Sequence, residues 1–394
     1  MECRPRRARA VKLLSPLSPG NGLPLPADQH LLGLGIAALE AALTEATDHP
    51  RAARAHAWST SPAGRRLLAT IFGNSPFLSS AAVAEWDFLT RLVDEGPDRL
   101  FGDIAAATET YADSGENRAM LMRRLRFAKR RVALLAAVAE LTGAWSLEQQ
   151  MATLSRFAAA AIGAAVRHLL QAAAAAGALV LDPGDPERNC GLIVLAMGKL
   201  GGGELNYSSD IDLILLYDVA CARGLSEDNA QSVYSRLARD LVRILDERSG
   251  DGYVFRTDLR LRPDPRSTPL AMSVAAALTY YETVGQNWER AALIKARPVA
   301  GDRVAAARFL AELQPFIWRK NLDFAAIEDI HSIKRQIQAH KGGARIAIEG
   351  HDIKIGRGGI REIEFFAQTQ QLIWGGRMRD LRVGPTCEAL RRLA

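Results

Sequence analysis

The sequence is poor in the residues that build disulfide frameworks, zinc sites and membrane spans. It has only four cysteines, which are scattered without any CxxC pairing, and none of its seven histidines has an HExxH-type spacing. No uninterrupted apolar run reaches the ~18 residues that a membrane span needs. These absences argue against a disulfide scaffold, a zinc enzyme and a membrane protein. They favour a reducing, cytoplasmic environment.

A strong charge of one sign and a P-loop are also absent. The 50 basic and 44 acidic residues give a formal net charge of +6, which permits an anionic partner without requiring nucleic acid. No G-x-x-x-x-G-K-[ST] motif occurs. The chain of 394 residues is nevertheless long enough for two or three domains with sizeable cores.

The N-terminal part of the chain predicts helices. Residues 1–27 are rich in Arg, Pro and Gly and predict a disordered or loosely attached lead-in, whose prolines disfavour a transit peptide. From residue 28 to 182, apolar residues recur at helical spacing and predict an all-helical domain. Its basic run within 116–143 is interpreted as a solvated helix face in preference to a nucleic-acid surface. A long Ala-rich helix is expected over 146–181.

The strongest chemical signal lies between Gly191 and Asp218. Residues 192–197 and 211–216 are short apolar runs, typical of strands buried on both faces. The turn between them offers free backbone amides and one ammonium group, which suit a phosphate. Its residues are Gly198, Lys199, Gly201, Gly202 and Gly203.

Two aspartates stand at the mouth of the second strand. Asp210 and Asp212 are two apart, so their carboxylates leave the same face of the pleat, roughly 7 Å apart at the backbone. Magnesium takes carboxylate oxygens together with substrate phosphate oxygens. A glycine turn or an Asp-x-Asp pair alone is usually structural, but the ordered set predicts phosphoryl or nucleotidyl transfer. Ser208 and Ser209 add hydroxyl donors before the pair.

A third acid follows a predicted crossover helix that starts after Ser226. Residues 253–264 then alternate like a strand, with apolar residues on one face. The polar face carries Arg256, Asp258, Arg260 and Arg262. One aspartate among arginines can be structural ion pairing. Beside an Asp-x-Asp pair, we interpret it as a third metal ligand or base within a set of phosphate-binding arginines.

These motifs resemble the nucleotidyltransferase superfamily. The ordered segments GKLGGGELNYSSDIDLI, FRTDLRLRP, WERAALIKARPVAGD and IKIGRGGIREIEFFAQ are similar to the glutamine synthetase adenylyltransferase family. Its bifunctional members both transfer and remove AMP, with two nucleotidyltransferase units in tandem. The resemblance is close over residues 191–374 and looser over the helical region before them. The ELN-x-x-SDID motif has Asn206 where the transferring unit tends to have Gly, and it resembles the N-terminal, adenylyl-removing unit.

The resemblance implies a predominantly helical α+β fold. A nucleotidyltransferase-type palm with a small mixed β-sheet is expected over residues 183–272, after the helical domain 28–182. A second helical domain, 273–394, is expected to close over the palm, with helices near 273–281, 287–295 and 323–341. Residues 351–374 predict a strand, a Gly-rich turn and a helix. Because the family enzyme is far longer, we expect this chain to be an N-terminal fragment.

The resemblance also implies the site. One or two Mg²⁺ ions would be held by three residues that are both catalytic and metal-ligating: Asp210, Asp212 and Asp258. The implied contacts to phosphate, ADP or ATP are Gly198, Lys199, Gly201, Ser209, Arg260, Arg262, Arg290, Lys295 and Arg297.

The implied function is removal of AMP from an adenylylated tyrosine of glutamine synthetase, which regulates nitrogen assimilation. Inorganic phosphate would attack the AMP phosphorus and release ADP. Glutamine synthetase is the expected partner, with the PII signal protein as a further one, and neither nucleic acid nor a membrane is expected. Two alternatives stay open: a unit that runs forward from ATP, and a non-catalytic docking or regulatory module. The presence of all three acids disfavours the second.

Overall fold

The computed structural model describes residues 22–320, 349–354 and 356–394. The chain divides into two compact units, Met1–Phe157 with Gly250–Gly252, and Ala158–Ser249 with Tyr253–Ala394. The division falls inside one long helix, α8 (Leu147–Ala175). The boundaries expected at residues 182 and 272 stay predictions. The first 21 residues of the lead-in and the helix expected over 323–341 lie outside the described residues.

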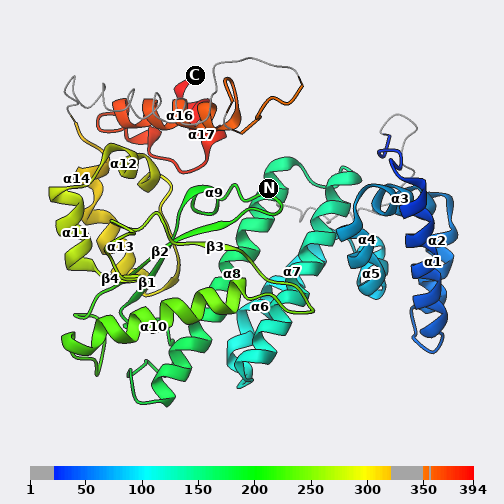
Figure 1. Ribbon diagram of the computed structural model, residues 1–394, viewed down its shortest axis with the longest axis horizontal. Helices are drawn as coiled ribbons and strands as arrows, with labels where there is room; N and C mark the ends of the chain where they lie inside the picture. The colour runs from blue at the N-terminus through cyan, green and yellow to red at the C-terminus, as the bar shows by residue number, and fades with distance from the viewer. Residues whose placement is uncertain (1–21, 321–348, 355) are drawn as a thin grey trace, which may run out of the picture. The chain divides into compact units, whose positions relative to one another are not determined.

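The first unit is built from helices, as the apolar spacing predicts (Figure 1). They are α1 (Gln29–Glu45), α2 (Ala52–Thr60), α3 (Pro62–Asn74), α4 (Pro76–Ala84), α5 (Trp86–Glu95), α6 (Pro97–Thr110), the 3-10 turn η1 (Tyr111–Ser114), α7 (Arg118–Leu141) and the start of α8. Side-chain caps set several of the starts. Asp28 accepts the backbone N–H groups of His30 and Leu31, while Ser61 and Ser75 cap helices whose first residue is proline.

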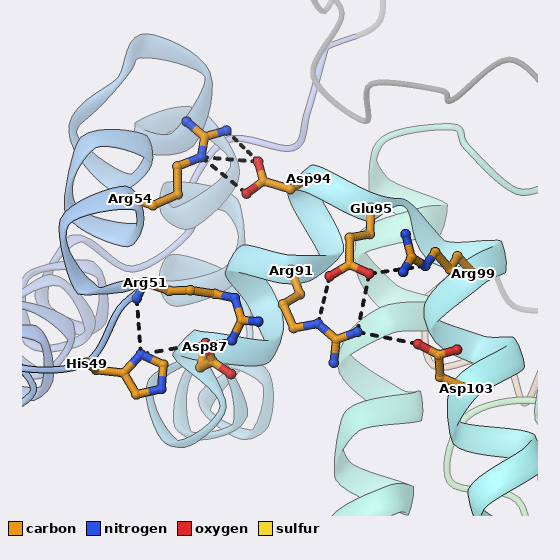
Figure 2. Close-up of polar contacts among 9 residues, drawn as sticks. All are labelled: His49, Arg51, Arg54, Asp87, Arg91, Asp94, Glu95, Arg99 and Asp103. Carbon is orange, nitrogen blue, oxygen red and sulfur yellow. Dashed lines mark hydrogen bonds and ion pairs between the residues drawn. The ribbon is translucent and has the colours of Figure 1, made fainter.

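An ion-pair network joins α2, α5 and α6 in this unit (Figure 2). The Arg51 guanidinium lies 2.8 Å from the Asp87 carboxylate, and Arg91 lies 2.7 Å from Glu95 and 3.4 Å from Asp103. All of these side chains are partly exposed, so each pair contributes at most about 1 kcal/mol. The network aligns the helices and neutralises the arginines.

The basic run in α7 is compensated in the same way. Arg124 pairs with Glu116, and Arg131 lies 2.7 Å from the buried Glu85 carboxylate, which Arg130 also approaches at 3.8 Å. Arginines with acidic partners of their own have less charge available for a phosphate backbone. The pairing agrees with the interpretation of this run as a helix face without a nucleic-acid role.

A five-stranded mixed sheet lies in the second unit. Its strands are β1 (Leu192–Ala196), β2 (Ile211–Tyr217), β3 (Thr257–Asp258), β4 (Ala271–Ser273) and β5 (Arg297–Gly301). The order is β3-β2-β1-β5, and β4 also pairs with β2. β1 runs antiparallel to β2 and β5, whereas β2 runs parallel to β3 and β4. The mixed sheet within a helical chain confirms the predicted fold class.

The second unit also contains the helices that follow α8 in the chain (Figure 1). They are α9 (Gly198–Gly201), α10 (Glu227–Asp246), α11 (Val274–Thr283), α12 (Asn287–Leu293), α13 (Arg303–Glu312), α14 (Gln314–Ile317), α16 (Ile360–Trp374), the 3-10 turn η2 (Arg379–Leu381) and α17 (Thr386–Leu393). α10 packs against β2, β3 and β4, while α13 packs against β1 and β5. The core on the α13 side of the sheet includes Ile193, Leu195, Ile214, Leu216 and Phe309, all at most 2% exposed.

By length and composition alone, α8 is apolar enough to cross a membrane. However, 61% of its most apolar stretch is buried inside the protein, as is usual for a core helix. The helix ends at Ala175, short of the predicted residue 181. Gly177 adopts φ +73°, and its amide donates to the Ala174 carbonyl, a glycine stop that ends the helix.

Two strand predictions were wrong. Within residues 253–264 only Thr257 and Asp258 form a strand, because the backbone turns at once after Asp258, whose carboxylate accepts the backbone N–H of Arg260. No strand forms among the described residues between 349 and 359. The helix that follows begins as predicted, with Gly359 as the N-cap of α16.

Candidate active site

The three predicted acids come from two neighbouring strands. Asp212 in β2 and Asp258 in β3 are direct partners in the parallel ladder, so their side chains leave the same face of the sheet side by side. Asp210 stands immediately before β2 begins. The pairing gathers carboxylates that are far apart in the sequence, and the residue spacing alone could not reveal it.

The acids affect one another electrostatically. Burial and the neighbouring carboxylates of Asp258 and Asp210 raise the pKa of Asp212 to about 6. Hydrogen bonds from Arg260 hold the pKa of Asp258 below its usual range. Neighbouring carboxyl groups whose pKa values are pushed apart are typical of functional acid clusters. At neutral pH both are anionic, so the cluster attracts cations.

Two arginines supply positive charge to the cluster. The Arg256 guanidinium donates to the Asp210 carboxylate and to the Ser208 carbonyl. Arg260 donates to both carboxylate oxygens of Asp258, its Nε lying 2.8 Å from Oδ2 and 3.0 Å from Oδ1. Arg256 belongs to the arginines that the alternating pattern predicts as phosphate-binding, yet here it pairs with an acid of the cluster. Internal ion pairs therefore hold two of the three acids.

The acids suit Mg²⁺ as a donor set, because hard carboxylate oxygens are its preferred protein ligands. The pKa of Asp212, raised in part by two adjacent carboxylates, indicates crowded negative charge that a divalent cation would relieve. In the arrangement seen here, no three His, Cys, Asp or Glu side chains of the described residues are placed to hold a metal ion. The guanidinium groups of Arg256 and Arg260 engage two of the carboxylates instead.

The glycine turn forms the short helix α9 next to these acids. Gly198 adopts φ +53°, and a Cβ atom at this position would lie 2.6 Å from Oδ2 of Asp212. Only glycine combines this backbone conformation with such a close approach at little cost. The turn thus packs its backbone directly against the central carboxylate.

Replacing Gly198 with alanine is therefore expected to push the Asp212 carboxylate aside. We expect a loss of about tenfold or more in catalytic rate, since displacement of a catalytic group by about 1 Å can cost ~100-fold. Steady-state rates measured across a magnesium titration test this. Gly203→Ala is the matched control, because Gly203 has φ +72° but nothing within 4 Å of its Cβ position. Equal rates in the two variants would contradict the carboxylate contact.

Gly201 and Arg297 have structural explanations. A Cβ on Gly201 would lie 2.0 Å from the Lys295 carbonyl oxygen, so glycine is needed here for packing against the segment before β5. Arg297 donates to the carbonyls of Gly201 at 3.1 Å and Leu200 at 2.9 Å. Both residues hold the glycine turn on the sheet, and their implied phosphate contacts stay predictions.

Lys295 is 3% exposed and lies in a buried ion cluster. Its Nζ lies 2.9 Å from the carboxylate of Glu204, which follows the glycine turn, and it also bonds Glu364 of α16. The Thr386 hydroxyl at the start of α17 lies 3.0 Å from the same Nζ, and the Thr386 amide donates to Glu204. Lys295 therefore ties the turn to two C-terminal helices.

Two other predicted phosphate contacts are committed to backbone carbonyls. Arg290 is fully buried and donates to the carbonyls of Phe316 and Ile317. Arg262 donates to Leu259 and to three carbonyls of the turn that follows it, those of Pro265, Thr268 and Pro269. These bonds use most of the donors that a phosphate would require.

Lys199 and Ser209 lie nearer to the acids in sequence and remain candidates. Lys199 is half-buried on α9, and no side-chain partner for its ammonium occurs in the described part of the chain. The Ser209 hydroxyl donates to the side-chain oxygen of Asn206. Of the predicted cationic contacts, Lys199 has no side-chain partner among the described residues, and Arg260 bonds only the cluster acid Asp258.

A cavity of about 460 Å³ opens beside the acid cluster. Asp210 and Asp258 line it together with three arginines, Arg256, Arg260 and Arg239 of α10. Leu259 and Leu270 add apolar surface. A volume of this size is usual for small-molecule sites, which range from ~300 to ~1,000 Å³. Arg239 is not among the predicted site residues, because the pattern of its helix predicts only a crossover between strands.

Comparison with known protein families shows which family the chain belongs to. The family model described as glutamate-ammonia ligase adenylyltransferase matches residues 65–312, a range that contains the whole sheet and all three acids. The chain belongs to this family. Membership in the glutamate-ammonia ligase adenylyltransferase family confirms the resemblance inferred from the motifs and supports an enzyme of the nucleotidyltransferase type. A second model, GlnD PII-uridylyltransferase, matches residues 331–394.

Curated relatives within this adenylyltransferase family share the name bifunctional glutamine synthetase adenylyltransferase/adenylyl-removing enzyme. The Rhizobium meliloti relative is 54% identical over 83% of this chain and 34% of its own length. Those from Bradyrhizobium sp. and Brucella suis are 52% and 53% identical, each over 83% of this chain and 33% and 34% of their own lengths. The chain thus spans about a third of the length of these relatives.

Proposed function

We propose that this chain removes AMP from an adenylylated tyrosine of glutamine synthetase by magnesium-dependent phosphorolysis. The observation that carries the proposal is the pairing of Asp212 with Asp258 against the glycine turn, in a family whose relatives are named for adenylyl transfer and removal. The ELN-x-x-SDID motif supports removal of AMP as the direction of the reaction, because it resembles the adenylyl-removing unit. Its Asn206 lies beside Ser209.

The proposed reaction exchanges one phosphorus–oxygen bond for another. An oxygen of HPO₄²⁻ attacks the AMP phosphorus, and the bond between that phosphorus and the tyrosine oxygen breaks. ADP and tyrosine form, and the proton of the attacking phosphate ends on the tyrosine oxygen. A phenol has a pKa of about 10, so the tyrosine leaves readily and needs no strong general acid.

The chain's residues would act by positioning and electrostatics, as in other phosphoryl transfers. Asp210, Asp212 and Asp258 would hold Mg²⁺, which when bound neutralises charge on the phosphoryl oxygens. To bind Mg²⁺, the carboxylates of Asp210 and Asp258 would have to give up their ion pairs with Arg256 and Arg260. Arg260, whose side chain is 83% exposed, is free to turn toward the substrate phosphate.

The same proposal covers partners and location. Glutamine synthetase is the protein substrate that the name of the relatives indicates. The match of residues 331–394 to a PII-uridylyltransferase model supports the PII signal protein as a further partner. A reducing cytoplasm suits the three described cysteines, Cys190, Cys221 and Cys387, which are all free thiols.

The decisive assay incubates this chain with adenylylated glutamine synthetase and Mg²⁺, with and without inorganic phosphate. We expect ADP to appear only when phosphate is present, and EDTA to abolish its release. The Asp212→Asn variant serves as the inactive control. Transfer of AMP from ATP to the unmodified target, without any release of ADP from the adenylylated one, would assign this unit to the opposite direction.

A further inference from the structure

Guanidinium groups outnumber carboxylates among the residues that line the cavity beside the acid cluster. Three guanidinium groups, those of Arg239, Arg256 and Arg260, line it with only two carboxylates, those of Asp210 and Asp258. Arg256 pairs with Asp210, and Arg260 pairs with Asp258. The remaining charge belongs to Arg239.

Arg239 reaches the cavity from a different element, the helix α10 that packs on β3. Its side chain is exposed, and its Nε donates a hydrogen bond to the carbonyl of Ser235, one turn earlier in the same helix, at 3.3 Å. Among the described residues, no carboxylate pairs with this guanidinium. A guanidinium without a counterion, beside the apolar surface of Leu259 and Leu270, is well suited to a small multivalent anion.

We propose that this cavity binds the attacking inorganic phosphate and that Arg239 is its principal ligand. The inference rests on the proposed phosphorolysis, for which it supplies the site of the nucleophile. Asp210 and Asp258 also line the cavity, so the bound phosphate lies next to the carboxylates that would hold Mg²⁺. Arg239 places an oxygen of that phosphate for attack on the AMP phosphorus, and the tyrosine oxygen leaves with the bonding electron pair.

The two ion pairs make phosphate binding depend on magnesium. When Mg²⁺ takes the carboxylates of Asp210 and Asp258, Arg256 and Arg260 lose their counterions within the same cavity. All three guanidinium groups then become available to one anion. Because such coupling is reciprocal, Mg²⁺ raises the affinity for phosphate and phosphate raises the affinity for Mg²⁺ by the same factor.

The test is a ³¹P NMR titration of inorganic phosphate into the chain, with and without Mg²⁺, in the absence of any protein substrate. We expect Mg²⁺ to tighten phosphate binding several-fold, and Arg239→Gln to weaken it about tenfold or more in the presence of Mg²⁺, since charge-assisted hydrogen bonds are the strong ones. Arg236→Gln is the matched control, because Arg236 is exposed on the same helix but does not line the cavity. That variant should bind phosphate as the wild type does.

Kinetics separate this inference from the proposed function. If the chain releases ADP, Arg239→Gln should raise the KM for phosphate about tenfold while leaving the KM for adenylylated glutamine synthetase unchanged. Phosphate affinity that is the same in Arg239→Gln and the wild type overturns the site, even if phosphorolysis is observed. Magnesium-dependent phosphate binding that Arg239→Gln removes supports the site, even if the protein substrate proves to be another.

Discussion

Asp212→Asn is expected to abolish nucleotide release while stabilising the fold in the absence of Mg²⁺. Asp212 is paired with Asp258 in the ladder, so the substitution removes the central carboxylate of the cluster. Removing one group that stabilises charge in the transition state typically costs ~10²- to 10³-fold in rate, and we expect a fall of at least this size. The same substitution removes a half-buried charge that burial and two neighbouring carboxylates disfavour. Activity and stability should therefore change in opposite directions.

The stabilisation should depend on pH with a defined sign. Asp212 has a pKa of about 6 in the folded chain against a reference value of 3.8, so between these values the folded state binds more protons than the unfolded state. The contribution of Asp212 to the stability of the wild type thus falls as pH rises from about 4 to about 6, by about 1–3 kcal/mol at ~1.4 kcal/mol per pKa unit. Asparagine carries no charge, so the advantage of the variant should be absent below about pH 4 and complete above about pH 6.

Urea unfolding in EDTA at pH 5, 6.5 and 8 measures this difference. Asp210→Asn is the control, because the Asp210 side chain is 52% exposed and pairs with Arg256, so its removal should give no comparable stabilisation. An Asp212→Asn variant that is less stable than the wild type at pH 8, or that keeps its rate, would contradict the crowded acid cluster.

Lys295→Met is expected to give the largest loss of stability in the second unit. The substitution would leave the carboxylates of Glu204 and Glu364 facing each other without the ammonium between them. Removing one partner of a buried ion pair typically costs 3–5 kcal/mol, and the partial exposure of Glu364, 29%, places the expected loss near about 3 kcal/mol. The midpoint of urea unfolding should fall accordingly.

Hydrogen exchange can localise the effect of Lys295→Met. Protection should fall at the glycine turn, α16 and α17, because Lys295 joins these three elements through Glu204, Glu364 and Thr386. The double variant Lys295→Met with Glu364→Gln should recover part of the loss, since one of the two unpaired charges is removed. If Lys295 were instead a phosphate ligand, the single variant would raise the KM for phosphate and leave protection unchanged.

Local sequence information predicts the chemistry of the acid cluster. The spacing of Asp210 and Asp212 at the start of β2 and the glycines before them predict a metal and phosphate site without any knowledge of the fold. Continuous apolar runs predicted β1 and β2, period-3.6 spacing predicted α10, and the structure confirms these three elements. These features depend on contacts between residues close in the chain, which is why the sequence alone was enough to predict them.

The orientation of the long cationic side chains could not be predicted in this way. Arg262, Arg290, Lys295 and Arg297 were expected near phosphate, yet their donors meet carbonyls or carboxylates that approach from other elements. A guanidinium bonds whichever acceptor the fold brings within reach, and residue type does not report those neighbours. Arg239 shows the converse, since only the packing of α10 beside β3 brings it to the cavity.

By itself, the sequence determined the family and the α+β class, and it predicts the acids of the site. The tertiary structure decided which acids are partners, which cations are committed elsewhere and where a cavity remains. The pairing of Asp212 with Asp258 follows from the parallel register of β2 and β3, which is set by contacts between distant segments. Such contacts form only once the chain has folded, so no local pattern encodes them directly.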